Sequence, residues 1–223
     1  MNTPSRRRVR AAALLAAIAT AGCSSAMSTT AAPQPAGATG GPRASAAPAA
    51  NPGDVKFVSG MIPHHAQAVL IAGWAQSHGA RPDVRVLCER IVNAQQDEIR
   101  LMQYWLREHG QAVPSGTMMY HPGMKMEGMD MGDHAMMPGM LNEEQLAALD
   151  KARGPEWDRL FLEDMIKHHE GALMMVDELL HSPGAAQDDI IYRMSSDVYA
   201  DQSTEIERMG KMLRSGPVPT RTP

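Results

Sequence analysis

The chain contains one helical pattern twice, and this duplication constrains its fold more than any other feature. Five residues define the first copy: Phe57, Met61, His64, His65 and Ala68. The same five residue types return at the same spacing in the second copy as Phe161, Met165, His168, His169 and Ala172. Steps of three and four residues place side chains on one face of a helix. Each copy therefore predicts a helix whose apolar face carries histidine.

A second helix with its own shared pattern follows in each copy. The pattern consists of Gln95, Glu98, Ile99 and Met102 in the first copy and of Gln202, Glu205, Ile206 and Met209 in the second. The separation between the two helices is three residues longer in the second copy. We place the extra residues in the turn at 182–184, because turns tolerate insertions. The sequence therefore predicts a duplicated helical hairpin.

Two hairpins predict an all-α fold, an antiparallel four-helix bundle. The expected long helices cover residues 54–78, 83–109, 155–181 and 187–214, with a short extra helix at 143–152. Only 4% of the residues are aromatic and 19 are methionine, a composition that suits close-packed helices better than a β-sandwich. The bundle domain at 54–214 then divides into a hairpin at 54–110, a Met/His-rich loop at 114–140 and a hairpin at 155–214, followed by a disordered tail at 215–223.

Residues 1–23 resemble an export signal. Several arginines precede an apolar run that is too short to span a bilayer as a permanent helix. The run ends in Thr-Ala-Gly-Cys, which resembles a bacterial lipobox, so we expect Cys23 to be lipidated and to anchor the chain to a membrane. The alternative is an ordinary residue near a cleavage site. Residues 24–53 have almost no large apolar side chain, which predicts a disordered tether.

The charge distribution favours cations over nucleic acid as partners. The net charge is −4, and the four arginines of the export signal contribute +4, so the rest of the chain carries −8 (−4 minus 4). An acidic body argues against binding to nucleic acid. If Cys23 is lipidated, Cys88 is the remaining thiol, which excludes a disulfide framework. We expect Cys88, which lies on an apolar stripe, to be a small buried residue rather than a ligand.

Polar residues interrupt the apolar stripes of all four predicted long helices. They are His64 and His168 in the first helix of each hairpin, and Gln95, Glu98, Gln202 and Glu205 in the second. Counted from the first turn, His64 and Glu98 differ in height by roughly 3 Å, at about 1.5 Å per residue. The second hairpin gives a similar result. The histidines and glutamates should therefore converge inside the bundle.

We interpret this convergence as a metal site, since a buried imidazole or carboxylate is costly unless it is paired or bound to a metal. Imidazole with thioether suits copper, and imidazole with carboxylate suits Cu(II), Zn(II) or iron. The candidate ligands are His64, His65, His168, His169, Met61, Met165, Glu98 and Glu205. One alternative is a purely structural layer in which His64 bonds to Glu98 and His168 to Glu205. In another, His65 and His169 face solvent at the edges of the stripes.

The loop between the hairpins carries a second metal signal. Its candidate ligands are Met118, Met119, His121, Met124, Met126, Met129, Met131, His134, Met136, Met137 and Met140. Methionine often fills gaps in cores, but this segment has no helical period and no apolar partners. Thioethers are soft ligands that select Cu(I) or Ag(I), and the run at 131–134 is similar to motifs of extracytoplasmic copper-resistance proteins. The main alternative is a segment that scavenges oxidants.

The duplicated segments resemble the domain-of-unknown-function 305 family. The resemblance rests on Phe-x-x-x-Met-Ile-Pro-His-His-x-x-Ala at 57–68 and Phe-x-x-x-Met-Ile-x-His-His-x-x-Ala at 161–172, and it covers residues 54–214. It implies a ferritin-like four-helix bundle, export from the cytoplasm and copper binding through methionine and histidine. Lys167 stands where the first copy has Pro63, so the two copies are not fully symmetric.

The sequence therefore favours an extracytoplasmic copper-binding protein that sequesters the ion or passes it to a copper transporter or chaperone. Silver, zinc and iron are further ions that these ligands accept. A ferritin-like oxidoreductase is a second hypothesis, but di-iron sites use Glu-x-x-His, and here Met61 and Met165 take the place of the glutamates. A third is a surface interaction module whose His–Glu pairs only stabilise the core. No catalytic residue is assigned.

Overall fold

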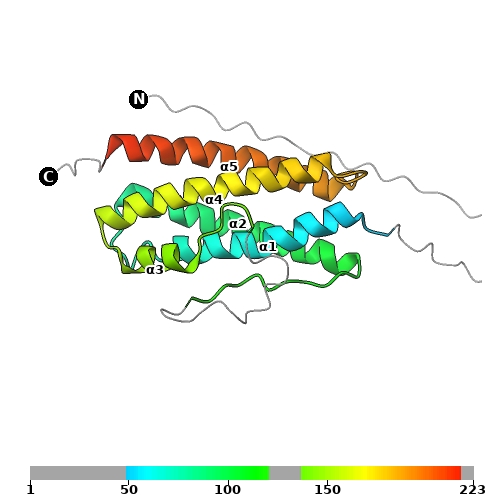
Figure 1. Ribbon diagram of the computed structural model, residues 1–223, viewed down its shortest axis with the longest axis horizontal. Helices are drawn as coiled ribbons and strands as arrows, with labels where there is room; N and C mark the ends of the chain where they lie inside the picture. Colours follow the sequence, from blue (N-terminus) through cyan, green and yellow to red (C-terminus); the bar gives the residue numbers. More distant parts are fainter. Residues whose placement is uncertain (1–48, 121–136, 217–223) are drawn as a thin grey trace, which may run out of the picture. The chain divides into compact units, whose positions relative to one another are not determined.

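The computed structural model describes residues 49–120 and 137–216, and every regular element within them is an α-helix (Figure 1). The helices are α1 (Pro52–Gly73), α2 (Pro82–Glu108), α3 (Glu143–Lys151), α4 (Pro155–His181) and α5 (Asp189–Ser215). The all-α prediction is confirmed, and the four long helices are consistent with the predicted bundle, while its ferritin-like character stays a prediction. None of the described helices is both long and apolar enough to cross a membrane.

Capping residues determine where several helices begin. The side chain of Asn51 accepts a hydrogen bond from N of Gly53 at the start of α1, and Asp188 caps α5 in the same way. Asn142 begins α3 with a reciprocal capping box, as its sequence predicted. α1 ends at Gly73 rather than near residue 78, because the chain continues in tight turns up to Gly79, whose φ is 72°.

The helices that carry the His-His pairs, α1 and α4, join the two hairpins. α1 packs against α2 and α4 packs against α5, while the α1–α4 contact connects the pairs. The short helix α3 lies beside α4 (Figure 1). The duplicated histidine motifs therefore face each other along the central interface of the bundle.

The apolar core consists of two clusters, one toward each end of the bundle. The first includes Phe57, Met61, Met102, Met175 and Ile191, and the second includes Ile71, Leu87, Trp157, Phe161 and Met209. Close to the boundary between them, each long helix carries two polar residues: His64 and His65, Gln95 and Glu98, His168 and His169, and Gln202 and Glu205. We call these eight residues the polar layer.

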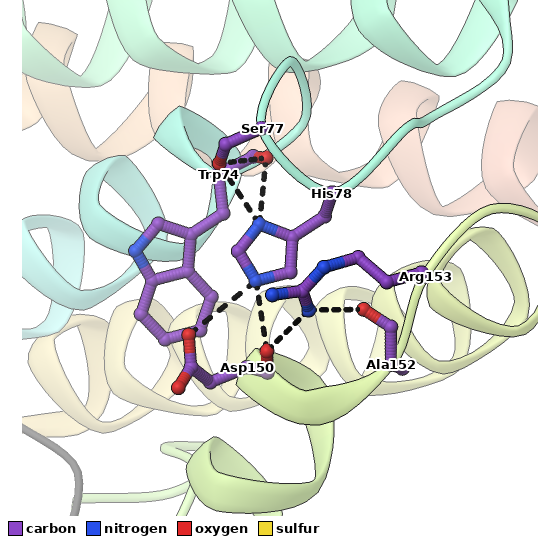
Figure 2. A network of polar contacts seen from close by, with 6 residues as sticks. All are labelled: Trp74, Ser77, His78, Asp150, Ala152 and Arg153. Carbon is purple, nitrogen blue, oxygen red and sulfur yellow. Dashed lines mark hydrogen bonds and ion pairs between the residues drawn. The ribbon is translucent and has the colours of Figure 1, made fainter.

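A buried histidine that the sequence analysis did not single out, His78, holds the turn between α1 and α2. Its ring centroid lies 5.5 Å from that of Trp74 and 5.9 Å from that of Trp157. Its Nδ1 is 3.1 Å from the carbonyl oxygen of Trp74, and its Nε2 is 3.0 Å from that of Asp150 (Figure 2). N of Gly154 donates to the carbonyl of His78 at 2.8 Å. These contacts tie the turn to the segment that joins α3 and α4.

Candidate metal centre

Four histidine side chains lie inside the bundle and are fully buried: His64, His65, His168 and His169, each 0% exposed. The rings of His64 and His168 meet across the α1–α4 interface with centroids 3.9 Å apart. The rings of His65 and His169 lie 6.3 Å from those of their chain neighbours. The alternative that His65 and His169 face solvent is therefore wrong, because α2 and α5 cover the edges of the stripes on α1 and α4.

The outer helices supply a carboxylate to the second histidine of each pair. Oε2 of Glu98 accepts from Nε2 of His65 at 2.7 Å, and Oε2 of Glu205 accepts from Nε2 of His169 at 2.8 Å. The expected height match of histidine with glutamate is present, but the alternative in which Glu98 bonds to His64 named the wrong partner. Consecutive residues differ by about 100° around a helix, so His65 faces α2 while His64 faces α4.

The main chain at the C-terminal end of the Met-rich loop covers His64. The carbonyl oxygen of Pro138 accepts from Nε2 of His64 at 3.0 Å. The amide of Gln67 then accepts from N of Leu141 at 2.7 Å and donates to its carbonyl oxygen at 3.0 Å. On the other side, a Cβ at position 171 would lie 1.9 Å from the carbonyl oxygen of Pro138, so only Gly171 permits this approach. We call residues 137–141 the covering segment.

Seven buried polar atoms of the polar layer have no hydrogen-bond partner within the described part of the chain. They are Nδ1 of His64, His65 and His169, both ring nitrogens of His168, and Oε1 of Gln95 and Gln202. Buried polar groups in proteins are nearly always satisfied, and leaving one without a partner costs about 1–3 kcal/mol. Their concentration in one layer makes this layer the candidate site for a bound ion.

Hydrogen bonding determines which nitrogen is free in three of the rings. Because carbonyl and carboxylate oxygens accept, Nε2 of His64, His65 and His169 carries the donated proton. In a neutral imidazole the lone pair then lies on Nδ1, and this is the unpartnered atom in each of the three rings. Metal-binding histidines are usually held in this way, with the other N–H donated to a carboxylate or a backbone carbonyl.

Burial keeps the central pair of rings neutral. Desolvation, assisted by the neighbouring His65, lowers the pKa of His64 to about 3. Desolvation and the contact with His64 also lower the pKa of His168 well below its ordinary value. A histidine must be neutral to bind a metal ion, so these two rings need not release a proton first.

The donors fit a soft ion of low coordination number better than a hard ion. Within residues 49–120 and 137–216, no three or more His, Cys, Asp or Glu side chains form a ready metal cage. The layer instead offers imidazole rings, and those of His64 and His168 have centroids 3.9 Å apart. Met61 and Met165 are 0% exposed and lie one turn before His64 and His168, and thioethers of this kind favour Cu(I) or Ag(I).

Most of the candidate ligands of the loop, and the candidate lipidation site, lie outside the described residues: His121, Met124, Met126, Met129, Met131, His134, Met136 and Cys23. Met119 is exposed and Met140 is partly buried. Met118 and Met137 pack against the first apolar cluster, so the expectation that the loop has no apolar partners is wrong for its two ends. Cys88 is buried as expected, and desolvation raises the pKa of its thiol.

Sequence reasoning missed the residues that receive the covering segment. Gln67 and Gly171 occupy equivalent positions of the two repeats. Gln67 forms hydrogen bonds to the covering segment, and Gly171 leaves room for it because it has no side chain. The signal was present in the sequence, because glycine within a helix is destabilising unless close packing requires it, and this glycine breaks the symmetry of the duplication.

Comparisons with known proteins agree with this architecture. The family model that matches the chain is the domain of unknown function DUF305, over residues 54–213. A DUF305 fragment from Deinococcus radiodurans has 29% sequence identity and a TM-score of 0.61, covering 75% of this chain and 99% of that one. CopM in its Cu(II)-bound form has 27% identity and a TM-score of 0.55, covering 73% and 96%. None of the curated proteins compared with the chain matches it.

Proposed function

Because the chain belongs to the DUF305 family, we propose that it is an extracytoplasmic copper-binding protein. It sequesters Cu(I) or Cu(II), or hands the ion on to a copper transporter or chaperone. The bundle site of histidine, methionine and glutamate holds the ion, and the Met-rich loop captures it. The similarity to CopM, which binds Cu(II) in the structure compared above, supports copper as the ion.

One observation carries this proposal: the four buried imidazoles of the polar layer have ring nitrogens without protein partners. A purely structural layer would use these nitrogens in hydrogen bonds between side chains. Among the described residues, only Nε2 of His65 and His169 is used in that way, through Glu98 and Glu205. Nδ1 of His64, His65 and His169 and both nitrogens of His168 have no partner there, and the neutral state of His64 and His168 favours the binding of an ion.

The residues around the site have different roles in binding the ion. His64 and His168 are the central ligands, since their rings are in contact across the helix interface. Glu98 and Glu205 orient the rings of the outer histidines and balance the charge of the ion. Met61 and Met165 add soft donors one turn away, which favours Cu(I), while imidazole with carboxylate accommodates Cu(II).

The Met-rich loop supports a capture step. Its thioethers are neutral, soft ligands for Cu(I), and its end is attached to the bundle directly above His64 through the carbonyl of Pro138. The export signal and the expected lipid anchor at Cys23 would keep the protein on the outer side of the cytoplasmic membrane. Copper bound there is kept away from the cytoplasm.

Copper titration of four forms of the full chain tests the proposal. They are the wild type, His64→Asn with His168→Asn, a loop variant with serine in place of Met124, Met126, Met129, Met131 and Met136, and the control His181→Asn. The side chain of His181 is 78% exposed on α4, so the control makes the same chemical change outside the layer. Cu(I) is titrated without oxygen against a coloured chelator, and Cu(II) in air.

We expect the wild type and the His181 control to bind copper more tightly than micromolar, about 8 kcal/mol. The double histidine variant should lose the bundle ion and keep the ions of the loop, and the loop variant should show the reverse. Circular dichroism verifies that each form is folded. Equal binding by all four forms, or no binding tighter than micromolar by the wild type, would refute the proposal.

A further inference from the structure

A cavity of about 490 Å³ lies between α1 and α4, beside the covering segment. Its walls include Phe57 and Gly60 from α1, Met175 and Leu179 from α4, and Met137. At its rim Lys56 forms an ion pair with Glu178. The lining is therefore mixed: Phe57, Leu179 and the two methionines form its apolar part, and Ser182 and the Lys56–Glu178 pair form its polar part.

Met137 and Met175 bring two thioether sulfurs to the walls of one cavity, and both side chains belong to the first apolar cluster or pack against it. Lys56, the cation at the rim, is already paired with a carboxylate. Neutral sulfur donors in apolar surroundings select soft monovalent ions over Mg²⁺, Ca²⁺ or Zn²⁺. Of the side chains that line the cavity, Met137 and Met175 are thus the ones suited to Cu(I) or Ag(I).

The duplication shows that packing alone does not require methionine at position 175. The equivalent position in the first repeat is Ile71, which is 0% exposed in the second apolar cluster. An aliphatic side chain is therefore enough to fill this position in the first repeat, where it is fully buried. Met175 stands where the position borders a cavity.

The covering segment links the cavity to the polar layer. Met137 directly precedes Pro138, whose carbonyl accepts from His64. Met175 lies seven residues after His168 on the same face of α4, which is about 10 Å along the helix axis. A soft ion in the cavity is thus next to the covering segment and about one and a half helical turns or more from the level of the central histidines.

We infer that this cavity is a second soft-metal site, in which Met137 and Met175 hold Cu(I) or Ag(I) in transit between the loop and the histidines. The inference rests on the proposed function for the identity of the natural ion. Two thioethers bind a monovalent ion without adding charge, and they bind it more weakly than a site that also contains imidazole. This increase in affinity from the cavity to the histidines lets the ion move from one site to the other.

Silver titration of the full chain, labelled with ¹³C at the methionine methyl groups, tests the inference. Ag(I) replaces Cu(I) because it has the same preference for sulfur and does not change its oxidation state. The Met137 and Met175 signals are assigned with Met137→Leu and Met175→Ile, the second of which installs the residue of the first repeat. Met209→Leu is the control, since Met209 is also 0% exposed but lies in the second cluster.

We expect the Met137 and Met175 methyl signals to shift together as Ag(I) is added, and the Met209 signal to stay in place. Met175→Ile should lose one equivalent of Ag(I), or bind it at least about tenfold more weakly, while Met209→Leu binds like the wild type. Circular dichroism and unfolding curves verify that the variants are folded. If the Met175 signal does not move at saturation, or if Met175→Ile binds like the wild type, the inference is wrong.

The same titration in the His64→Asn, His168→Asn background separates this inference from the proposed function. The Met175 signal should still shift there, because the cavity site does not use these histidines. A shift that disappears with the histidines would mean that the methyl group only senses the polar layer, and it would overturn the cavity site. Binding in the cavity with none at the histidines would support the cavity site and refute the bundle site.

Discussion

His64 and His65 are neighbours in the chain, yet their side chains have different partners. His64 contacts the ring of His168 and donates to the carbonyl of Pro138, whereas His65 donates to Glu98. The difference follows from the turn of about 100° between consecutive helical residues. The repeat reproduces the second arrangement in His169 and Glu205, while neither nitrogen of His168 finds a partner among the described residues.

The metal-free protein should lose stability as the pH falls below the ordinary histidine pKa of 6.5. Burial lowers the pKa of His64 to about 3, from 6.5 in an exposed chain, and it lowers that of His168 in the same direction. Below pH 6.5 these two histidines therefore bind protons in the unfolded chain but stay neutral in the folded bundle. Stability is complete above pH 6.5 and declines toward pH 3, by up to about 1.4 kcal/mol per pH unit for each ring.

Urea unfolding across this pH range checks the prediction, with His64→Leu, His168→Leu as the comparison. Burial raises the pKa of the Asp54, Asp158 and Asp164 carboxyls, and these groups act oppositely, since they favour the folded state at low pH and lose that contribution as pH rises. Both proteins keep these aspartates, so the difference between them reports the two histidines. In identical buffers, the free energy of unfolding of the wild type should fall more steeply on acidification than that of the leucine variant. Equal slopes in the two proteins would contradict the neutral state of the pair.

At the scale of elements, the covering segment connects the two hairpins above the polar layer. It bonds to α1 through His64 and Gln67, and it lies directly on α4 at Gly171. Gly139 of the segment has a φ of 80°, and a Cβ there would lie 2.4 Å from the carbonyl oxygen of Lys167. Both glycines are needed for backbone to approach backbone.

Gly171→Ala should displace the covering segment from α4. The new Cβ would lie 1.9 Å from the carbonyl oxygen of Pro138 and 2.8 Å from Cα of Gly139, so the segment must move at a cost of about 1–3 kcal/mol in the free energy of unfolding. Gly73→Ala is the matched control, since a Cβ at that helical position meets nothing within 4 Å. It should be neutral or slightly stabilising.

Denaturant unfolding gives the two stabilities, and chemical modification of histidine by diethyl pyrocarbonate reports whether His64 has become accessible. In the alanine variant at 171, His64 should react faster than in the wild type, because its Nε2 loses the cover of Pro138. Similar stability and reactivity in both alanine variants would show that the segment does not depend on Gly171.

The contacts of His78 should hold α3 and the first turn together. His78→Phe keeps a ring between Trp74 and Trp157 but removes the two polar ring nitrogens, which lie 3.1 Å and 3.0 Å from the carbonyl oxygens of Trp74 and Asp150 (Figure 2). We expect a loss of about 1–3 kcal/mol and faster hydrogen exchange of the amides in α3. His181→Phe, on the exposed surface of α4, provides the control and should leave exchange in α3 unchanged.

At the scale of the whole molecule, the site draws ligands from both hairpins, so a bound ion should stabilise the entire bundle. His64 lies on α1 and His168 on α4, the two helices that join the hairpins. An ion that binds only the folded state at a concentration of 100 Kd adds about 2.7 kcal/mol to the free energy of unfolding. Thermal unfolding with and without Ag(I) measures the gain, which His64→Asn, His168→Asn should reduce. An undiminished gain in that variant would contradict a bundle site shared by the hairpins.

The helices, their pairing into duplicated hairpins, and the depth at which histidine and glutamate meet could all be predicted from the sequence. These properties follow from periodicity and helix rise, which are local. Tertiary packing sets the pairing of Glu98 with His65, the contact of Pro138 with His64, and the cavity that Met137 helps to line. Such contacts depend on the rotation of each helix about its axis and on a close approach at Gly171, which involve residues far apart in the chain. The His-His motif can be recognised in the sequence alone, whereas the packing of the helices determines which of its ring nitrogens have no hydrogen-bond partner among the described residues.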